Sequence, residues 1–454
     1  MSSHSWGSET GELKGKDKGS VVSSVPVSPA QRDRQADSDL ARLYALNGDA
    51  LGVLMALGTL ERTVTPDLAV PRVRRPQQAI PRGIPRTGRV IVVIPAHNEA
   101  ASIGNTLRSL RYQTRLPEQV MVVCDNCTDD TDTIAAQNGA QVMWTLRNAG
   151  RKAGALNQAL SLILPAIDDE DFVLTMDADS QLSRNWIKEA AQALDQNRNV
   201  GAVCGTFLGE AGHGLLGQLQ RNEYFRYARQ VRRHRQVRVL SGTGSLFRVR
   251  ALREIARERD NILPGRHGQY YDPTSITEDN EITLAMKTIG YQCRVARGCY
   301  TLTEVMPTWR HLFRQRLRWQ KGTLSDLRHY GVTAVTVGYW MKQVFIYMTL
   351  LASAVCWLII GLSLGHHLGI DLSWTAAILS VSLVERTITV RKAGLRGTLL
   401  AALVIPEFAY DIFRLTFFLR ALLDDLLLRD ITWNHVVKDA AQDSLCYTGH
   451  DSPV

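Results

Sequence analysis

The chain has 454 residues, of which 45% are hydrophobic and 21% charged, and it carries a formal net charge of +9. This length is sufficient for a complete catalytic domain and a second module. The seven cysteines are too few and too scattered for a disulfide scaffold, which favours a reducing compartment. The positive charge suits nucleic acid, anionic lipid or a phosphorylated substrate as a partner.

The two ends of the chain have a different composition from its middle. Residues 1–38 are polar and rich in Ser and Gly, so they predict a disordered tail, and no apolar run there indicates a signal peptide. Residues 39–88 predict a short helical segment, too short to span a bilayer, and a proline-rich linker. We expect residues 431–454 to form a C-terminal tail.

From Arg89 onward, buried strands alternate with helical segments. Strands are predicted at 89–95, 118–124, 140–144 and 171–177, with helix-like stretches of ten to fifteen residues between them. This alternation predicts βαβ units, a mostly parallel sheet and an α/β domain over residues 89–305.

Polar residues follow several of these strands, at the edge where parallel sheets bind ligands. Glu99 follows the first strand, Asp125 the second, and Asp177 and Asp179 the fourth. No glycine-rich nucleotide motif follows the first strand, so neither a dinucleotide fold nor a P-loop is indicated. The two later aspartates can offer oxygen ligands to Mg²⁺ or Mn²⁺, although such a pair also occurs as a simple turn or helix cap.

Six short motifs occur together in one order: PAHNEA, CDNCTDD, RKAGALN, DAD, ITED and QRLRW. In this order they resemble the family 2 glycosyltransferases, and in particular the membrane-associated branch that includes cellulose, chitin, hyaluronan and poly-N-acetylglucosamine synthases. The resemblance covers about residues 89–330. It implies a GT-A fold, which is Rossmann-like, followed by a helical membrane region.

The resemblance also implies roles for individual residues. It makes Glu99 and Asp125 contacts to the uridine of a UDP-sugar and Lys152 a ligand of its diphosphate, although a lone lysine there is commonly just solvated. It makes Asp177 the nucleotide-facing carboxylate, Asp179 the ligand of Mg²⁺ or Mn²⁺, and Asp279 the general base. The residues that close the acceptor and diphosphate side are Gln315, Arg318 and Trp319.

A glycine-bearing loop after a strand-like run occupies residues 239–248. By the resemblance, the residues that cradle the acceptor sugar are Ser241, Gly242, Thr243 and Gly244, whose small side chains allow a pyranose ring to approach the backbone. A plain turn is the alternative. Tyr270, Tyr271 and Trp309 can offer stacking faces for a sugar, although core packing explains these aromatic residues equally well.

Cys124 and Cys127 have the spacing of a redox dithiol or half a zinc site. No second pair of cysteines or histidines occurs at zinc spacing. We therefore interpret Cys124 as the last buried residue of a strand and Cys127 as a loop residue in a serine position.

Two basic stretches precede the apolar C-terminal part. In residues 221–238, Tyr224, Phe225, Tyr227 and Val231 can share one helical face, and no nucleic-acid fold signature accompanies the arginines. We expect a cationic helix beside an anionic bilayer and no nucleic-acid partner. Residues 306–335 predict an amphipathic interface helix that carries the QRLRW motif.

Residues 336–430 predict membrane-associated helices, with membrane lipid as a partner. The stretch 344–365 has no charged residue and is long enough to span a bilayer. A second span at 372–384 and a third at 397–419 remain open. In the latter, Glu407, Asp411 and Arg414 lie close to one helix face, so they can either pair inside a bundle or face water at the interface. The basic loop at 385–396 should face the cytosol.

These features together predict a cell-membrane protein with a cytoplasmic catalytic domain, an inverting glycosyltransferase that uses a nucleotide-diphosphate sugar. Because few spans are predicted, we expect one or a few sugars to be transferred to a protein, lipid or short glycan acceptor. A processive polysaccharide synthase is the alternative within enzymes. A catalytically silent membrane scaffold is the alternative from another class.

Overall fold

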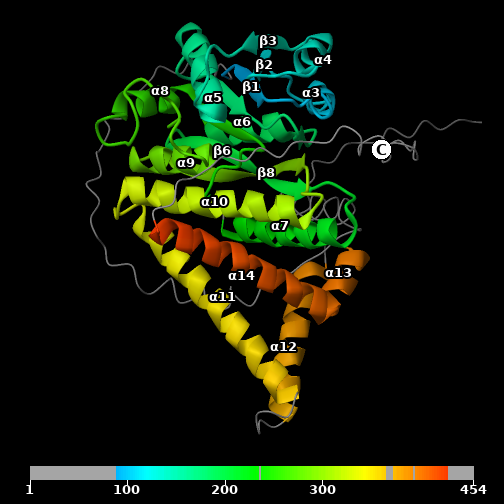
Figure 1. Cartoon of the computed structure of the whole chain (residues 1–454). Helices are drawn as coiled ribbons and strands as arrows, with labels where there is room; N and C mark the ends of the chain where they lie inside the picture. The colour runs from blue at the N-terminus through cyan, green and yellow to red at the C-terminus, as the bar shows by residue number, and fades with distance from the viewer. Residues whose placement is uncertain (1–87, 235–236, 365–371, 392–393, 428–454) are drawn as a thin grey trace, which may run out of the picture.

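The computed structural model describes residues 88–234, 237–364, 372–391 and 394–427. An α/β body lies at one end, and a group of long helices extends from it (Figure 1). The tails predicted at 1–38 and 431–454 lie outside the described residues, as does the segment predicted at 39–88 except for Gly88.

The body is built on one eight-stranded sheet in the order β3-β2-β1-β4-β7-β6-β8-β5. Its strands are β1 (Val90–Ala96), β2 (Gln119–Cys124), β3 (Gln141–Trp144), β4 (Phe172–Thr175), β5 (Gln181–Leu182), β6 (Val200–Gly209), β7 (Ser245–Arg248) and β8 (Gln292–Thr303). The first four are parallel, in the places that the sequence predicts.

The prediction of a mostly parallel sheet holds only in part for the second half, where β6 and β8 pair in parallel but the other pairings are antiparallel. Strand β7 is antiparallel to both of its neighbours, β4 and β6, and β5 is antiparallel to β8. The loop at 239–244 also precedes a strand, β7, rather than following one. Buried strands of either direction carry the same run of apolar residues, so hydrophobic patterning alone does not reveal their direction.

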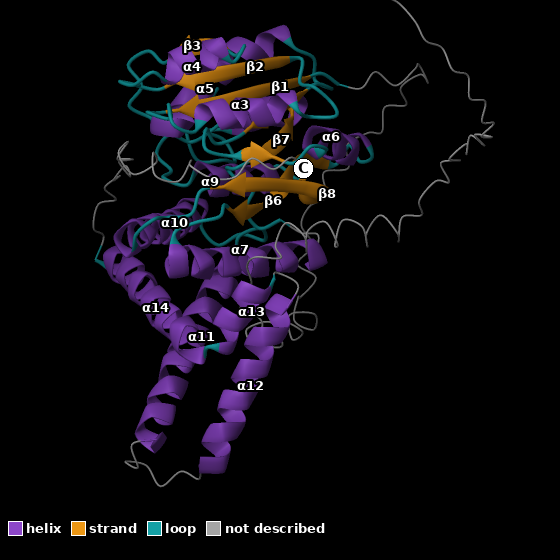
Figure 2. Ribbon diagram, turned by 90° about the vertical axis from the view of Figure 1, so that its right-hand side faces the viewer, coloured by secondary structure: helices purple, strands orange, loops and turns teal. Residues whose placement is uncertain are grey.

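Helices cover both faces of the sheet (Figure 2). One core packs α5 (Arg151–Ile163), α8 (Val249–Glu258) and α9 (Glu278–Thr288) against one face. The other core packs α3 (Ile103–Arg111), α4 (Thr131–Gln137) and α6 (Trp186–Asp195) against the opposite face. Successive residues of β1 alternate between the two cores, as the pleat of a strand requires.

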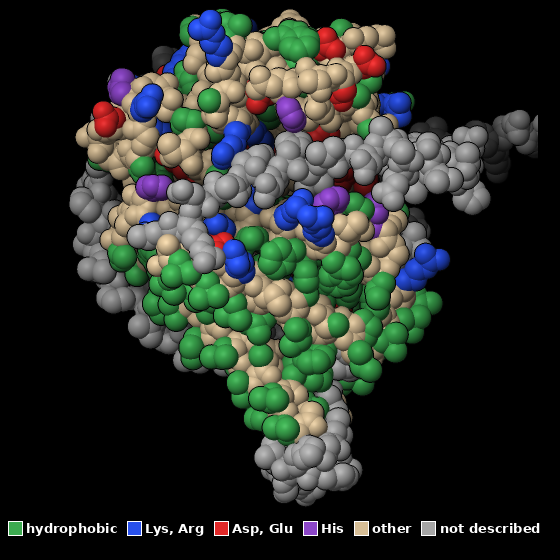
Figure 3. All heavy atoms as spheres, viewed as in Figure 1, with side chains coloured by type: hydrophobic (Ala, Val, Ile, Leu, Met, Phe, Trp, Pro, Cys, Tyr) green, Lys and Arg blue, Asp and Glu red, His purple; other side chains and the backbone are tan. Residues whose placement is uncertain are grey.

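The remaining helices lie on the far side of the sheet from β1 and β2. They are α7 (Gly214–His234), α10 (Trp309–Tyr330), α11 (Val337–Leu364), α12 (Leu372–Val390), α13 (Leu395–Ala402) and α14 (Val404–Leu426). Helices α7 and α10 lie next to the body, whereas α11 and α12 project away from it (Figure 1). Hydrophobic side chains gather on the surface of this projecting part (Figure 3).

Among the described residues, the helix segment Val337–Leu362 alone is long and apolar enough to cross a membrane, and only 11% of its most apolar window is buried. It contains most of the span predicted at 344–365 and begins earlier. The stretch predicted at 397–419 is divided between α13 and α14, which meet at Leu403.

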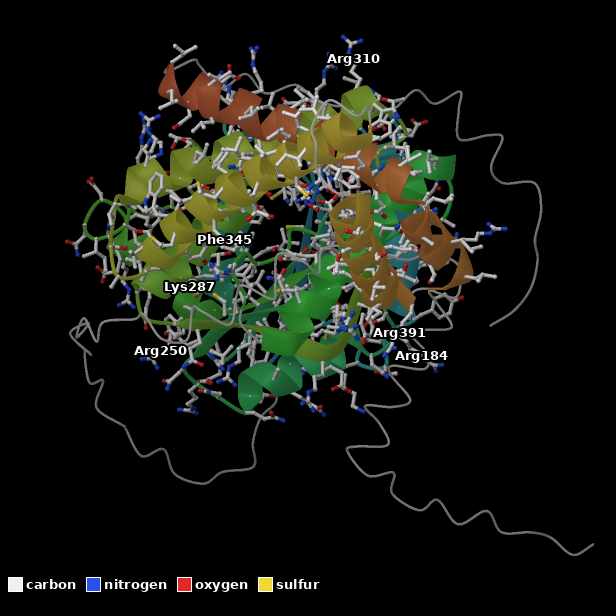
Figure 4. All side chains as sticks on the ribbon, turned by 90° about the horizontal axis from the view of Figure 1, so that it is seen from below. Arg184, Arg250, Lys287, Arg310, Phe345 and Arg391 are labelled. Atoms are coloured by element: carbon white, nitrogen blue, oxygen red, sulfur yellow. The ribbon has the colours of Figure 1, made fainter. Side chains whose placement is uncertain are left out.

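Two predictions about charged residues in this region need correction. The stretch 385–396, predicted as a loop, is helical in α12 up to Val390, while the exposed Arg391 lies at the rim of the molecule (Figure 4). In α7, the arginines Arg221 and Arg226 are buried rather than placed beside a bilayer. They are buried because each has a partner inside the protein: Arg221 donates to backbone carbonyls and Arg226 pairs with Glu407.

Glu407 is the centre of a buried charge cluster between helices. Its carboxylate lies 3.2 Å from Arg226 of α7 and 3.3 Å from Arg386 of α12, and Arg386 also pairs with Asp411. Arg414 lies 3.7 Å from Asp411. Of the two placements that the sequence left open, the structure has these charges paired inside the helix bundle.

Candidate functional site

A cavity of about 810 Å³ lies where the carboxyl ends of β1, β2 and β4 meet helices α7, α9 and α10. Twelve of the thirteen residues predicted from the sequence line it. They are Glu99, Asp125, Lys152, Asp177, Asp179, Ser241, Gly242, Thr243, Asp279, Gln315, Arg318 and Trp319. Residues far apart in the sequence therefore meet in one space.

Asp125, at the end of β2, is held by a set of hydrogen bonds. Its Oδ1 accepts from Thr145 Oγ1 at 2.8 Å and from Asn148 Nδ2 at 2.9 Å. On the neighbouring strand end, Glu99 accepts from Ser102 Oγ at 2.6 Å. Both carboxylates are thus held by hydrogen bonds at the wall of the cavity.

Lys152, in the first turn of α5, makes the shortest ion pairs of the site. Its Nζ lies 2.6 Å from Asp177 Oδ1 and 2.5 Å from Glu278 Oε1. Burial works against its charge, but Asp177, Glu278 and Asp279 outweigh that effect and raise its pKa well above the usual value. Lys152 is therefore a permanent cation in the middle of the cavity.

Asp177 and Asp179 follow β4 directly, and both are partly exposed. Asp177 faces Lys152, whereas Asp179 accepts a hydrogen bond from Ser180 Oγ at 3.2 Å. Among the described residues, no group of three or more His, Cys, Asp or Glu side chains is arranged to hold a metal ion. A cation at this position would need part of its coordination from a bound ligand.

The loop from Ser241 to Gly244 closes over the lysine. The amide of Asp177 donates to the carbonyl of Gly242 at 3.0 Å. A Cβ atom on Gly242 would lie 3.1 Å from Lys152 Nζ, so a side chain here would require the lysine to shift by a few tenths of an ångström. Gly244 does not line the cavity; it packs against Trp186 and Leu182 in the core.

Asp279 lies in the first turn of α9, next to Glu278. Burial and the neighbouring Glu278 raise the pKa of Asp279 to about 6, while Lys152 partly opposes that change. Burial alone would raise the pKa of Glu278, but Lys152 keeps it below its usual value. Two adjacent carboxyl groups thus differ in proton affinity, and Asp279 has the higher one, as a group that accepts a proton near neutral pH requires.

Helix α10 presents Gln315, Arg318 and Trp319 to the cavity. The guanidinium of Arg316 lies 4.4 Å from the centre of the Trp319 ring and 5.4 Å from that of Tyr224. Arg316 is fixed by Glu223 at 2.8 Å. The positively charged guanidinium of Arg316 therefore lies close to the indole ring of Trp319 and is held there by Glu223.

Sequence reasoning missed several cavity residues. Glu278 lies inside the ITED motif. A buried lysine needs a negatively charged partner, and this requirement could have identified Glu278 as the partner of Lys152. Glu223, Tyr224 and Tyr227 come from α7, and Arg414 from α14. Nothing in their local sequence indicates that these helices reach the site.

The predicted stacking residues lie elsewhere. Tyr271 is buried in the core beneath the sheet, and Tyr270 packs against that core. Trp309 contacts Phe413 of α14 with ring centres 4.9 Å apart. The aromatic side chains that do line the cavity are Phe207, Tyr224, Tyr227, Trp319, Phe417 and Phe418.

The two cysteines at the end of β2 are free thiols. Cys124 is fully buried at the strand end, as predicted, and Cys127 is partly buried in the following loop. A hydrogen bond from Cys124 lowers the pKa of Cys127 to about 7.

Comparison with known proteins adds the family. The model of the family "Glycosyl transferase family 2" matches residues 91–256, which include the strand ends and the loop over Lys152. The chain is 27% identical over 277 residues to the "Probable glycosyltransferase YdaM" of Bacillus subtilis, a match that covers 58% of this chain and 60% of that protein. It is 22% identical over 240 residues to the "Poly-beta-1,6-N-acetyl-D-glucosamine synthase" of Staphylococcus aureus, covering 51% of this chain and 54% of that one.

These matches span little more than half the length of the curated relatives. Among solved structures, the "Mannosyltransferase PcManGT from Pyrobaculum calidifontis in complex with GDP-Man and Mn2+" aligns with a TM-score of 0.49 at 17% identity, over 87% of this chain and 97% of that one. The family match and the two glycosyltransferase relatives agree with the motif order read from the sequence. Residues 91–256 therefore form a family 2 glycosyltransferase domain.

Proposed function

We propose that the protein is a membrane-bound, inverting glycosyltransferase of the GT-A type that transfers a sugar from a nucleotide-diphosphate sugar to a hydroxyl acceptor. The observation that carries the proposal is the arrangement around Lys152, which lies 2.6 Å from Asp177 with Asp279 in the same cavity. A cation for a leaving diphosphate and a base for an incoming hydroxyl are thus close together.

The donor, expected to be a UDP-sugar, would bind at the strand ends. Asp125 and Glu99 are oriented to accept hydrogen bonds from the base and ribose. Lys152 and Arg318 would meet the diphosphate, because cations that are in place before the reaction stabilise the charge that develops on a leaving group. Lys152 would exchange its contact with Asp177 for one with phosphate oxygen.

The residues at the diphosphate position fit a divalent cation. Asp179, with Asp177 beside it, offers hard oxygen ligands of the kind that Mg²⁺ and Mn²⁺ prefer, and phosphate oxygens would complete the coordination. When bound, such an ion neutralises charge on the leaving diphosphate.

Asp279 would accept the proton of the acceptor hydroxyl. As that oxygen forms a bond to the anomeric carbon, the bond from this carbon to the diphosphate oxygen breaks and the nucleoside diphosphate leaves. Attack from the face opposite the leaving group inverts the anomeric centre. The raised pKa of Asp279, about 6, makes it a stronger base than an ordinary aspartate while leaving it mostly ionised at pH 7.

The acceptor would bind between α7, α10 and α14. This end of the cavity combines aromatic faces with the Glu223–Arg316 pair, a surface suited to sugar rings. We expect transfer of one or a few sugars to a protein, lipid or short glycan. The likeness to a poly-N-acetylglucosamine synthase favours a processive enzyme as the second candidate.

The exposed apolar surface of α11, which includes Met341, Val344 and Met348, supports attachment to the cell membrane with the catalytic domain on the cytoplasmic side. Membrane lipid would then surround α11. In a domain surrounded by water, other parts of the protein would cover a helix surface that is apolar over this length.

The test is turnover of a panel of nucleotide sugars by the full chain in detergent, with Mg²⁺ or Mn²⁺ and with mass analysis of the product. Release of nucleoside diphosphate together with a glycosylated product is the expected result. If no donor is turned over, the silent scaffold is the better description. A long polymer retained by the enzyme would favour the processive candidate.

A further inference from the structure

A buried carboxylate of α10 lies against the turn that carries Asp279, and no step described above uses it. Asp326 is 2% exposed and lies further along the helix that presents Trp319 to the cavity. It does not itself line the cavity.

Three donors from the turn converge on this carboxyl group. Its Oδ1 accepts from Ser275 Oγ at 2.8 Å, and its Oδ2 accepts from Thr277 Oγ1 at 2.9 Å and Asn280 Nδ2 at 2.8 Å. The donors lie on both sides of Asp279 in the sequence. One side chain of α10 therefore holds the turn before and after the proposed base.

A second observation, on the backbone, shows how close this contact is. A Cβ atom on Gly322 would lie 2.3 Å from Thr277 Oγ1 and 2.5 Å from Thr277 Cγ2. Any other residue at 322 would force the helix away from the turn. The glycine and Asp326 thus act on the same residue, Thr277, from one face of α10.

We propose that Asp326 is a positioning residue that fixes Asp279 at a set distance from the cavity face of α10. It acts through Ser275, Thr277 and Asn280, and Gly322 makes the approach possible. This inference rests on the proposed function, in which Asp279 is the base and Trp319 borders the acceptor. Helix α10 then carries one wall of the acceptor site and also sets the place of the base.

The consequence is that loss of Asp326 should affect transfer more than donor binding. A displacement of about 1 Å of a catalytic group is sufficient for a rate loss of about 10²-fold. The residues proposed to meet the base and ribose, Glu99 and Asp125, follow other strands, and the hydrogen bonds described above join them to Ser102, Thr145 and Asn148. Of the donor-binding residues described above, Lys152 is paired with the turn, through Glu278.

The experiment compares Asp326→Ala with Asp424→Ala in the full chain. Asp424 is the matched control, because it is also a buried carboxylate bonded to α10, through Lys321 Nζ at 3.2 Å, away from the turn. We expect kcat to fall about 10²-fold in Asp326→Ala while the affinity for UDP-sugar changes far less. Asp424→Ala should keep the parent kcat. An unchanged kcat in Asp326→Ala would overturn the proposal.

Hydrogen–deuterium exchange gives a readout that does not depend on activity. Exchange at residues 275–280 should rise in Asp326→Ala and not in Asp424→Ala. Should Asp326→Ala fail to fold, the double variant Ser275→Ala/Thr277→Val removes two of the same hydrogen bonds from the turn side and should show the same rise. Parent-like exchange at the turn would refute the positioning role, whereas a parent enzyme that turns over no donor refutes only the proposed function.

Discussion

Charged side chains have different surroundings at the cavity of the sheet-based body and among the projecting helices. In the body, Lys152, Asp177 and Asp279 face a cavity where a ligand can reach them. In the helices, Glu407, Arg386 and Asp411 neutralise one another inside the bundle, while apolar side chains cover the outside (Figure 3). Charge in the body is available for chemistry, whereas charge in the helices fastens α12 and α14 to α7. The same kind of residue therefore has a different purpose on each side of the molecule.

The largest effect is expected at the carboxylate proposed to hold the cation. Asp179→Ala should reduce sugar transfer below detection, and EDTA should do the same to the parent, because the leaving diphosphate would lack its neutralising ion. Turnover is followed by release of nucleoside diphosphate. Full activity in EDTA would show that the charges of the body act without a metal.

The proposed base gives the next largest effect. Asp279→Asn keeps the side-chain shape and removes the proton acceptor, so transfer should fall about 10²–10⁴-fold while donor binding persists. Calorimetry of the donor and a kinetic assay separate the two. Loss of donor binding instead would mean that Asp279 has a structural role.

The pH profile tests the same group without mutation. Because the pKa of Asp279 is raised to about 6, its carboxylate takes up a proton as the pH falls through that value. Transfer should therefore be fully developed above the midpoint and decline on the acid side, about tenfold for each further pH unit. A profile that stays flat between pH 5 and pH 7 in the assay would argue against a base with this pKa.

The charge cluster of the helices should matter for stability rather than for chemistry. Glu407→Ala leaves Arg226 and Arg386 buried without their shared partner, which should cost about 3–5 kcal/mol in the free energy of unfolding. The control is Arg198→Ala in the body, whose exposed contact with Glu170 at 3.9 Å should contribute less than about 1 kcal/mol. Thermal denaturation in detergent measures both. Equal losses would remove the contrast between the two regions.

The smallest effect is expected from the thiols of the body. Cys124→Ser and Cys127→Ser should leave transfer close to that of the parent, and elemental analysis of the purified protein should find no zinc. Both follow from the interpretation of Cys124 as a strand residue and Cys127 as a loop residue. Stoichiometric zinc would instead show that this strand end is a metal site.

The sequence predicted which residues after the strands meet in the cavity, and the reason is geometric. Parallel strands bring their carboxyl ends to one edge, so a polar residue after each strand, such as Asp125 or Asp177, must lie near the others. The contribution of α7 could not be predicted in this way. Helical periodicity shows which face of α7 is buried but not what covers it, and Glu407 lies 181 residues from its partner Arg226.

Strand β7 was missed altogether, because its residues lie in the stretch 239–248 that was predicted as a loop. Its four residues are all buried, so even a predicted strand here would not have revealed its direction. The reversal matters for the site, because it starts β7 at the edge where β4 ends. The loop from Ser241 to Gly244 is thereby delivered directly over Asp177 and Lys152.

Gly242 has a consequence for how related sequences can diverge. Since a methyl group there would lie 3.1 Å from Lys152 Nζ and 3.2 Å from Asp177 Oδ2, even alanine requires this ion pair to shift by a few tenths of an ångström. In a saturation library screened for activity, this codon should tolerate fewer replacements than those for Ser241 and Thr243, whose side chains bond mainly to each other. We therefore expect functional homologues to keep glycine at position 242, while the residues at positions 241 and 243 vary.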